Sequence, residues 1–109
     1  MYDPQNAFKA LADPTRREIL HMLSARDMSI QEVCERFEMT RAAVKKHLGV
    51  LENGRLISVH QKGRERINKL EPQGLKSVAE WLSYFEQFWN TKLDALQDLI
   101  ETEHEKTDE

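Results

Sequence analysis

The chain has 109 residues, 39% of them hydrophobic and 32% charged, which is typical of one globular domain with or without an extension. No apolar run approaches the roughly 20 residues of a membrane-spanning helix, and the first residues lack the basic and apolar regions of a signal peptide. We therefore expect a cytoplasmic protein without a membrane partner. Its single cysteine excludes an intrachain disulfide.

The net charge of −3 conceals an uneven distribution of charge along the chain. Residues 40–70 contain eight Lys or Arg and two acidic residues, whereas the remainder contains eight basic and seventeen acidic residues. A basic segment is often only a solvated face, but it is also the electrostatic pattern of a nucleic-acid-binding surface. The charge count alone leaves both interpretations open.

Two helix starts are marked early in the chain. An Asp-Pro pair at 3–4 and another at 13–14 each place an N-cap residue before a proline at the first helical position. The pattern predicts a short helix over 4–12 and a second helix over 14–25. The inward residues of the second helix are Ile19, Leu20 and Leu23.

Two adjacent arginines, Arg16 and Arg17, lie near the exposed start of this second helix. Cations at a helix N-terminus oppose the helix dipole, so the pair is expected to have a partner elsewhere. The partner is either an acidic side chain of this protein or a phosphate of DNA, and we favour the acidic side chain.

The next segment has the layout of a helix-turn-helix. Ser29 and Glu32 form a Ser-x-x-Glu capping box, which predicts a third short helix over 30–37 with Val33 and Phe37 inward. Only two residues separate this helix from Thr40, the N-cap of the next one. Two short helices joined by such a tight turn are typical of this motif.

The helix that follows Thr40 is the element around which the chain is organised. Its apolar residues recur at three- and four-residue steps, and Gly54 is expected to end it with a left-handed backbone. A helix that buries a narrow stripe and offers cations on its other faces suits the major groove of DNA. The inward residues are Val44, Leu48 and Leu51, and the candidate DNA contacts are Thr40, Arg41, Lys45, Lys46 and His47.

A hairpin follows this helix directly. Residues 55–61 and 64–70 have strand character, and Gly63 between them supplies the backbone conformation of a tight turn. A basic hairpin in this position is interpreted as a wing along a phosphate backbone or a minor groove. The candidate wing contacts are Lys62, Arg64 and Arg66.

From Pro72 the pattern predicts a helix almost to the end of the chain, with an apolar seam about seven turns long and a second aromatic row beside it. A helix with this much apolar surface is usually covered on two sides. In so small a domain, the element that covers the second side is most simply the same helix of another copy, so we predict a homodimer. The candidate interface residues are Phe8, Leu11, Trp81, Leu82, Tyr84, Phe85, Phe88, Trp89, Leu93 and Leu96.

Together these elements predict a mainly α fold with a small β-hairpin, a winged helix-turn-helix of five helices plus the wing. The predicted organisation is a DNA-binding domain with an N-terminal dimer helix over 1–71 and a dimerisation helix over 72–101. Residues 102–109 are acidic and are predicted to be a disordered tail.

Four segments carry a resemblance to a known family: DPTRREIL at 13–20, TRAAVKKHLGVLENGRL at 40–56, KGRERINKLEP at 62–72 and WLSYFEQFWNTKLDAL at 81–96. In this order the chain resembles the ArsR-type winged helix-turn-helix transcriptional repressors, above all the branch with an aromatic last helix. The resemblance implies a homodimer, joined through the first and last helices, that reads a pseudo-palindromic operator in double-stranded DNA. Lys45 replaces a usual small hydroxyl residue and Asn68 a common wing tyrosine, which leaves the target sequence open.

Many members of this family sense metals, but the sequence favours a protein without a metal or cofactor. One family site needs a cysteine pair near the third helix, where only Cys34 is present, and another needs histidines along the last helix, where residues 75–100 have none. A tight transition-metal site needs three or four nitrogen or sulfur ligands. We expect Cys34 to be a small, partly buried helix residue.

No nucleotide-binding glycine loop or catalytic triad pattern is present, so we expect no enzyme and no catalytic residues. The predicted function is sequence-specific repression of transcription. Two alternatives stay open: an effector-gated sensor of a small hydrophobic ligand, and a winged-helix module that docks onto an acidic protein partner. The sequence does not identify an effector.

Overall fold

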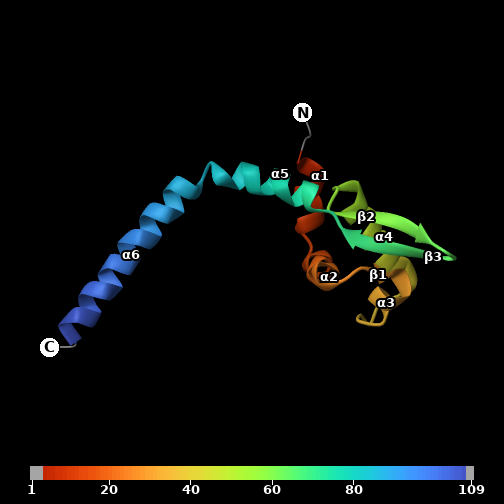
Figure 1. Cartoon of the computed structure of the whole chain (residues 1–109), viewed down its shortest axis with the longest axis horizontal. Helices are drawn as coiled ribbons and strands as arrows, with labels where there is room; N and C mark the ends of the chain where they lie inside the picture. Colours follow the sequence, from red (N-terminus) through yellow and green to blue (C-terminus); the bar gives the residue numbers. More distant parts are fainter. Residues whose placement is uncertain (1–3, 108–109) are drawn as a thin grey trace. The chain divides into compact units, whose positions relative to one another are not determined.

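A computed structural model describes residues 4–107, without the side chains of 91–94 and 103–107. The elements are, in chain order, α1 (Gln5–Leu11), α2 (Pro14–Ala25), β1 (Met28–Ser29), α3 (Ile30–Cys34), α4 (Arg41–Asn53), β2 (Ile57–Lys62), β3 (Glu65–Leu70), α5 (Pro72–Ser83) and α6 (Glu86–Thr107) (Figure 1). No helix in this part of the chain combines the length and the hydropathy needed to cross a bilayer.

The chain forms two compact units that divide within α5, between Val78 and Ala79. The predicted boundary was the start of this helix. The division falls later because Gly74 and Val78 are buried in the first unit, so the first turns of α5 belong to its core. The second unit consists of the rest of α5 and of α6.

The first unit has one apolar core to which every helix from α1 to α5 contributes. The inward residues predicted for α2 and α4 are all buried, which confirms the apolar stripes of both helices. In α1 the fully buried residues are Ala7 and Ala10, while Phe8 and Leu11 pack at the margin of the core. These small side chains allow α1 to lie close to its neighbours.

The predicted cap of α2 is confirmed. The Asp13 carboxylate accepts a hydrogen bond from the backbone N–H of Arg16 at 3.1 Å, and this hydrogen bond lowers the pKa of the carboxyl. In α1 the N-cap is Pro4, without a side-chain cap, and Asp3 lies outside the described residues.

The capping box of α3 is also confirmed. The Ser29 hydroxyl accepts from the Glu32 N–H at 3.2 Å, and the Glu32 carboxylate accepts from the Ser29 N–H at 3.1 Å. The second of these bonds, followed by the bond from Arg26, lowers the pKa of Glu32. The helix ends at Cys34, three residues earlier than predicted, because the next residues continue in i→i−3 turns that include Phe37.

The sheet has three strands rather than the predicted two, in the order β1-β3-β2. The hairpin of β2 and β3 is antiparallel, with Val59 opposite Asn68, and Gly63 adopts a φ of +62° in its turn as expected. The added strand pairs Met28 with Asn68. Asn68 is only 3% exposed, and its side-chain amide donates to the Met28 carbonyl at 3.2 Å.

The end of α4 differs from its predicted form. Gly54 has a φ of −83°, and the left-handed conformation belongs to Arg55, with a φ of +58°. Glycine is required for another reason, because a Cβ at position 54 would lie 2.8 Å from the backbone oxygen of Asn6. Gly54 therefore allows the backbone of α1 to pack directly on the end of α4.

The predicted long C-terminal helix is interrupted between α5 and α6, at Tyr84 and Phe85. Phe85 and Phe88 make i→i−3 backbone bonds there, each 2.9 Å long. The rings of Trp81, Tyr84 and Phe88 all contact Phe85, so four aromatic side chains form a cluster at this turn. Further on, α6 continues to Thr107, into the segment predicted as a disordered tail, and residues 108–109 lie outside the description.

Candidate nucleic-acid interface

The cap of α4 places its first turn as predicted. The Thr40 hydroxyl accepts from the backbone N–H of Ala43 at 3.1 Å, and this bond fixes where the helix begins. The apolar stripe of α4, which includes Val44, faces the core. The side chains of Arg41, Lys45 and Lys46 lie on its other sides and are all exposed.

A groove with a volume of about 410 Å³ lies between α4 and the β2–β3 hairpin. We call it the α4–wing groove. Both α4 and the hairpin contribute basic side chains to the groove, and Leu48 and Val59 contribute apolar surface. The tertiary structure thereby brings together four of the eight predicted DNA contacts: Arg41, Lys45, Arg64 and Arg66.

The electrostatics of this groove are dominated by its cations. Glu52 and Glu65 also line it, so the basic side chains outnumber the acidic ones by four to two. No described carboxylate forms an ion pair with the arginines or the lysine of the groove, since the Arg26–Glu32 pair lies outside it. Lys62 is exposed at the end of β2, beside the turn of the hairpin.

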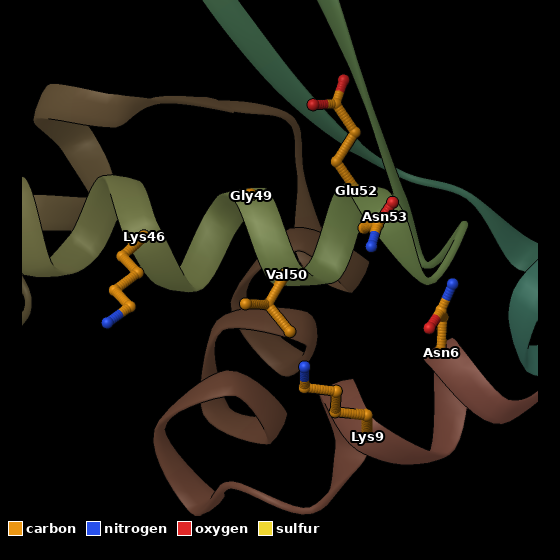
Figure 2. A pocket seen from close by; sticks show the side chains of 7 residues that line it. All are labelled: Asn6, Lys9, Lys46, Gly49, Val50, Glu52 and Asn53. Carbon is orange, nitrogen blue, oxygen red and sulfur yellow. The ribbon is translucent and has the colours of Figure 1, made fainter.

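Lys46 lies on another side of α4. Together with Lys9, Asn6 and Asn53 it lines a second polar space, of about 470 Å³, which we call the α1–α4 cleft (Figure 2). The predicted basic surface is therefore divided by α4 itself. Gly49 lines both spaces.

His47 does not line either space. Its side chain is half-buried, and its Nδ1 lies 3.4 Å from Nη1 of Arg16 on α2. This contact places the side chain of His47 between α4 and α2.

The arginine pair of α2 has partners that the sequence analysis did not consider. Arg16 donates from Nε to the Ala10 carbonyl at 2.8 Å and from Nη2 to the Lys9 carbonyl at 3.0 Å. Arg17 donates to the Leu11 carbonyl at 2.6 Å. The expectation of an acidic partner was wrong: the arginines satisfy the carbonyls at the C-terminus of α1, where the helix dipole favours cations.

Most of the predicted dimer residues carry exposed apolar surface. In the second unit the exposed large apolar residues include Trp81, Leu82, Tyr84, Phe88, Trp89 and Leu96, and also Leu99 and Ile100, which were not predicted as interface residues. Phe85 is half-buried within the aromatic cluster, and Phe8 and Leu11 are half-buried in the first unit. The Leu93 side chain lies outside the described residues.

Among the described residues no three His, Cys, Asp or Glu side chains are grouped as metal ligands. Cys34 is a half-buried free thiol at the end of α3. The imidazole of His60 is exposed and lies within hydrogen-bond distance of the Ser58 hydroxyl, at 2.8 Å.

Among the groove residues that sequence reasoning missed are Glu52, Glu65 and Asn68, the last of which was noted only as a departure from a family pattern. Sequence reasoning also missed Lys9 and Asn6 of the α1–α4 cleft. Glu65 and Asn68 could have been found from the strand register, and Glu52 from the helical spacing that places it seven residues after Lys45. Lys9 and Asn6 depend on how α1 packs against α4.

Comparison with known proteins gives consistent matches. A family model described as a helix-turn-helix domain matches residues 11–60. The transcriptional repressor SdpR of Bacillus subtilis is 35% identical over 80 residues, covering 73% of this chain and 89% of SdpR. The HTH-type transcriptional regulator Rv2034 of Mycobacterium tuberculosis is 34% identical over 104 residues, covering 95% of this chain and 94% of that protein.

Among solved structures, the crystal structure of an ArsR family transcriptional regulator is similar, with a TM-score of 0.72 and 34% sequence identity. The similarity covers 79% of this chain and 94% of that structure. The matched region therefore includes α4 and the hairpin that together form the α4–wing groove.

Proposed function

Because this chain belongs to the ArsR-type winged helix-turn-helix transcriptional regulators, a family that binds DNA, we propose that it is a homodimeric repressor of transcription. Each copy would read one half of a pseudo-palindromic operator. The observation that carries the proposal is the α4–wing groove, where Arg41 and Lys45 of a helix meet Arg64 and Arg66 of a hairpin. Such a groove can follow both a base edge and the adjacent phosphate backbone.

Base reading is assigned to the first turns of α4. Arg41 and Lys45 are exposed donors that can reach N7 and O6 of guanine, and Thr40 begins the helix that carries them. His47 lies on the same helix, and its contact with Arg16 holds α4 against α2 while α4 is bound to DNA.

Backbone contacts are assigned to the remaining cations. Lys46, Lys62, Arg64 and Arg66 would bind phosphates, fix the register of the protein and make binding strongly dependent on salt. None of these four side chains is buried, so binding a phosphate requires no rearrangement of the core.

The dimer is assigned to the exposed apolar residues of α5 and α6, with Phe8 and Leu11 of α1 at its margin. Supporting observations are the exposure of two tryptophans and of Tyr84, which is 66% exposed. Exposed apolar surface on this scale commonly marks a protein interface. A twofold pair of recognition helices matches the symmetry of a pseudo-palindromic operator.

The experiment that tests the proposal is selection of bound duplexes from random DNA with the purified full chain. We expect a consensus of two inverted half-sites about one helical turn apart. Salt-sensitive retention on heparin without any enriched DNA sequence would contradict the proposal, and would favour a module that docks onto an acidic protein. We also propose that the protein acts in the cytoplasm.

The proposal includes no resident metal, because one cysteine near α3 and no histidine in 75–100 do not reproduce the ligand sets that we associate with the family. Metal analysis of the protein purified without chelator tests this part independently. Stoichiometric zinc would overturn it while leaving the DNA-binding proposal intact.

A further inference from the structure

The α1–α4 cleft has the chemistry of a site for a phosphate group. Lys9 extends from α1 toward Val50 of α4, and Lys46 projects from α4 (Figure 2). The amides of Asn6 and Asn53 add hydrogen-bond donors at the other end of the cleft. Ammonium and amide groups around a polar space of about 470 Å³ favour an anion with several acceptor oxygens.

The two ammonium groups are available to such an anion. Within the described residues neither Lys9 nor Lys46 takes part in an ion pair. Glu52 is the one acid lining the cleft, and its side chain points away from both lysines, toward the strands (Figure 2). The positive charge of the cleft is therefore not cancelled by its own lining.

Gly49 lines this cleft as well as the α4–wing groove, and it leaves the surface of α4 without a side chain at that position. It is an exposed residue in the interior of α4, and glycine at such a position lowers the stability of a helix by about 1 kcal/mol relative to alanine. No atom of the chain lies within 4 Å of the position that a Cβ would take, so packing within the protein does not require the glycine. A glycine at this position would allow the backbone of another molecule to approach α4 closely.

The shape of the cleft is set before any ligand binds. The end of α4 packs directly on α1 at Gly54, where a Cβ would lie 2.8 Å from the Asn6 backbone oxygen. Arg16 holds the last turn of α1 through the Lys9 carbonyl, at 3.0 Å. Lys9 and Lys46 are thus carried by two helices whose spacing is fixed.

The cleft also remains open if α1 takes part in a dimer. The two α1 residues assigned to the dimer, Phe8 and Leu11, are each two positions from a residue of the cleft, Asn6 and Lys9, and two positions are about 200° apart around an α-helix. The dimer surface and the cleft are consequently on different sides of α1.

We propose that the α1–α4 cleft binds a phosphodiester of the same DNA, with Lys9 of α1 and Lys46 of α4 contacting it and Gly49 allowing the strand to approach the helix. This inference rests on the proposed function. It makes α1 a second element that binds the DNA backbone, in addition to the wing, on the side of α4 that faces away from the wing. The wing and α1 would then hold phosphates on either side of the recognition helix.

The test compares the full-length chain with Lys9→Gln, using a random-sequence duplex of about 40 base pairs, long enough for two half-sites. Binding is measured by fluorescence anisotropy over a salt series. Lys9→Gln should lower affinity about threefold near physiological salt and reduce the slope of log K against log salt by about 0.9 for each bound copy. Lys76→Gln, which removes an exposed lysine of α5 outside the cleft, is the matched control and should change neither quantity.

A second variant, Gly49→Ala, separates binding from folding. It should leave the melting temperature unchanged or raise it by a few degrees, because alanine favours the helix, while weakening DNA binding. Unchanged binding of both Gly49→Ala and Lys9→Gln, alongside a reduced salt slope for Arg64→Ala, would overturn this inference and leave the proposed function standing. A wild-type chain that binds no duplex would overturn both, and a shift of Lys9→Gln to monomer in sedimentation would identify the cleft as an interface between copies instead.

Discussion

Arg16 Nη1 lies 3.4 Å from Nδ1 of His47, and through this contact one guanidinium joins three helices. The other nitrogens of Arg16 bind the carbonyls of Lys9 and Ala10 at the end of α1, while Asp13 caps the first turn of α2 that carries the arginine. The helix α4 is thus held relative to α1 by polar contacts as well as by the apolar core.

Replacement of Arg16 by glutamine should lower the free energy of unfolding by about 1–3 kcal/mol, because charge-assisted bonds to two carbonyls are lost. Urea unfolding followed by circular dichroism measures the change. Arg26→Gln is the matched control: it breaks an exposed ion pair, which contributes at most about 1 kcal/mol. Equal effects of the two substitutions would contradict the assigned role of Arg16.

Glu32 should make folding stability depend on pH in the acidic range. Its folded-state pKa lies below the ordinary 4.5, chiefly because the carboxylate accepts the Ser29 N–H, so its charge stabilises the fold above that value. This contribution is lost as the pH falls through the lowered folded-state pKa. Urea midpoints of wild type and Glu32→Gln should therefore differ near pH 7 and converge as the pH falls below 4.5 and through the lowered pKa. A constant difference over this range would show that the charge of Glu32 is not what stabilises the cap.

Arg41→Ala should reduce discrimination at one base pair of each half-site, by about 1–3 kcal/mol, because Arg41 is assigned to a guanine edge. Selection of bound DNA with the variant, compared with wild type, measures this directly. The rest of the consensus should be retained. A consensus that is unchanged at every position would remove Arg41 from base reading.

Arg64→Ala should weaken binding to all duplexes by a similar factor, because a phosphate contact has no sequence information. The salt slope should fall by about 0.9 for each bound copy. Affinities for the selected operator and for a random duplex, measured in parallel, give both quantities. If the affinity for random DNA at low salt is unaffected, the wing does not contact the backbone through Arg64.

Leu96→Asp should convert the dimer to a monomer, because it places a charge on a 52% exposed leucine of the proposed interface. Sedimentation velocity at micromolar concentration measures the state. Asn90→Asp introduces the same charge at an exposed polar position of α6 and should leave the dimer intact. A wild-type chain that sediments as a monomer would refute the dimer itself.

The sequence by itself determined the local elements of this fold. The caps at Asp13, Ser29 and Thr40 and the apolar stripes of α2 and α4 are confirmed, because a cap or a helical stripe depends on residues three or four apart. The turn at Gly63 was predictable for the same reason, since its backbone conformation requires glycine.

Only the tertiary structure decided which distant residues meet. The pairing of β1 depends on Met28 and Asn68, which are 40 positions apart, and a two-residue strand is too short to show a period of its own. The carbonyl partners of Arg16 and Arg17 and the joining of Lys9 to Lys46 likewise depend on the packing of α1 against α2 and α4. Local sequence patterns specify the helices and strands, but packing decides which of their faces come together. The α4–wing groove and the α1–α4 cleft lie where such faces meet.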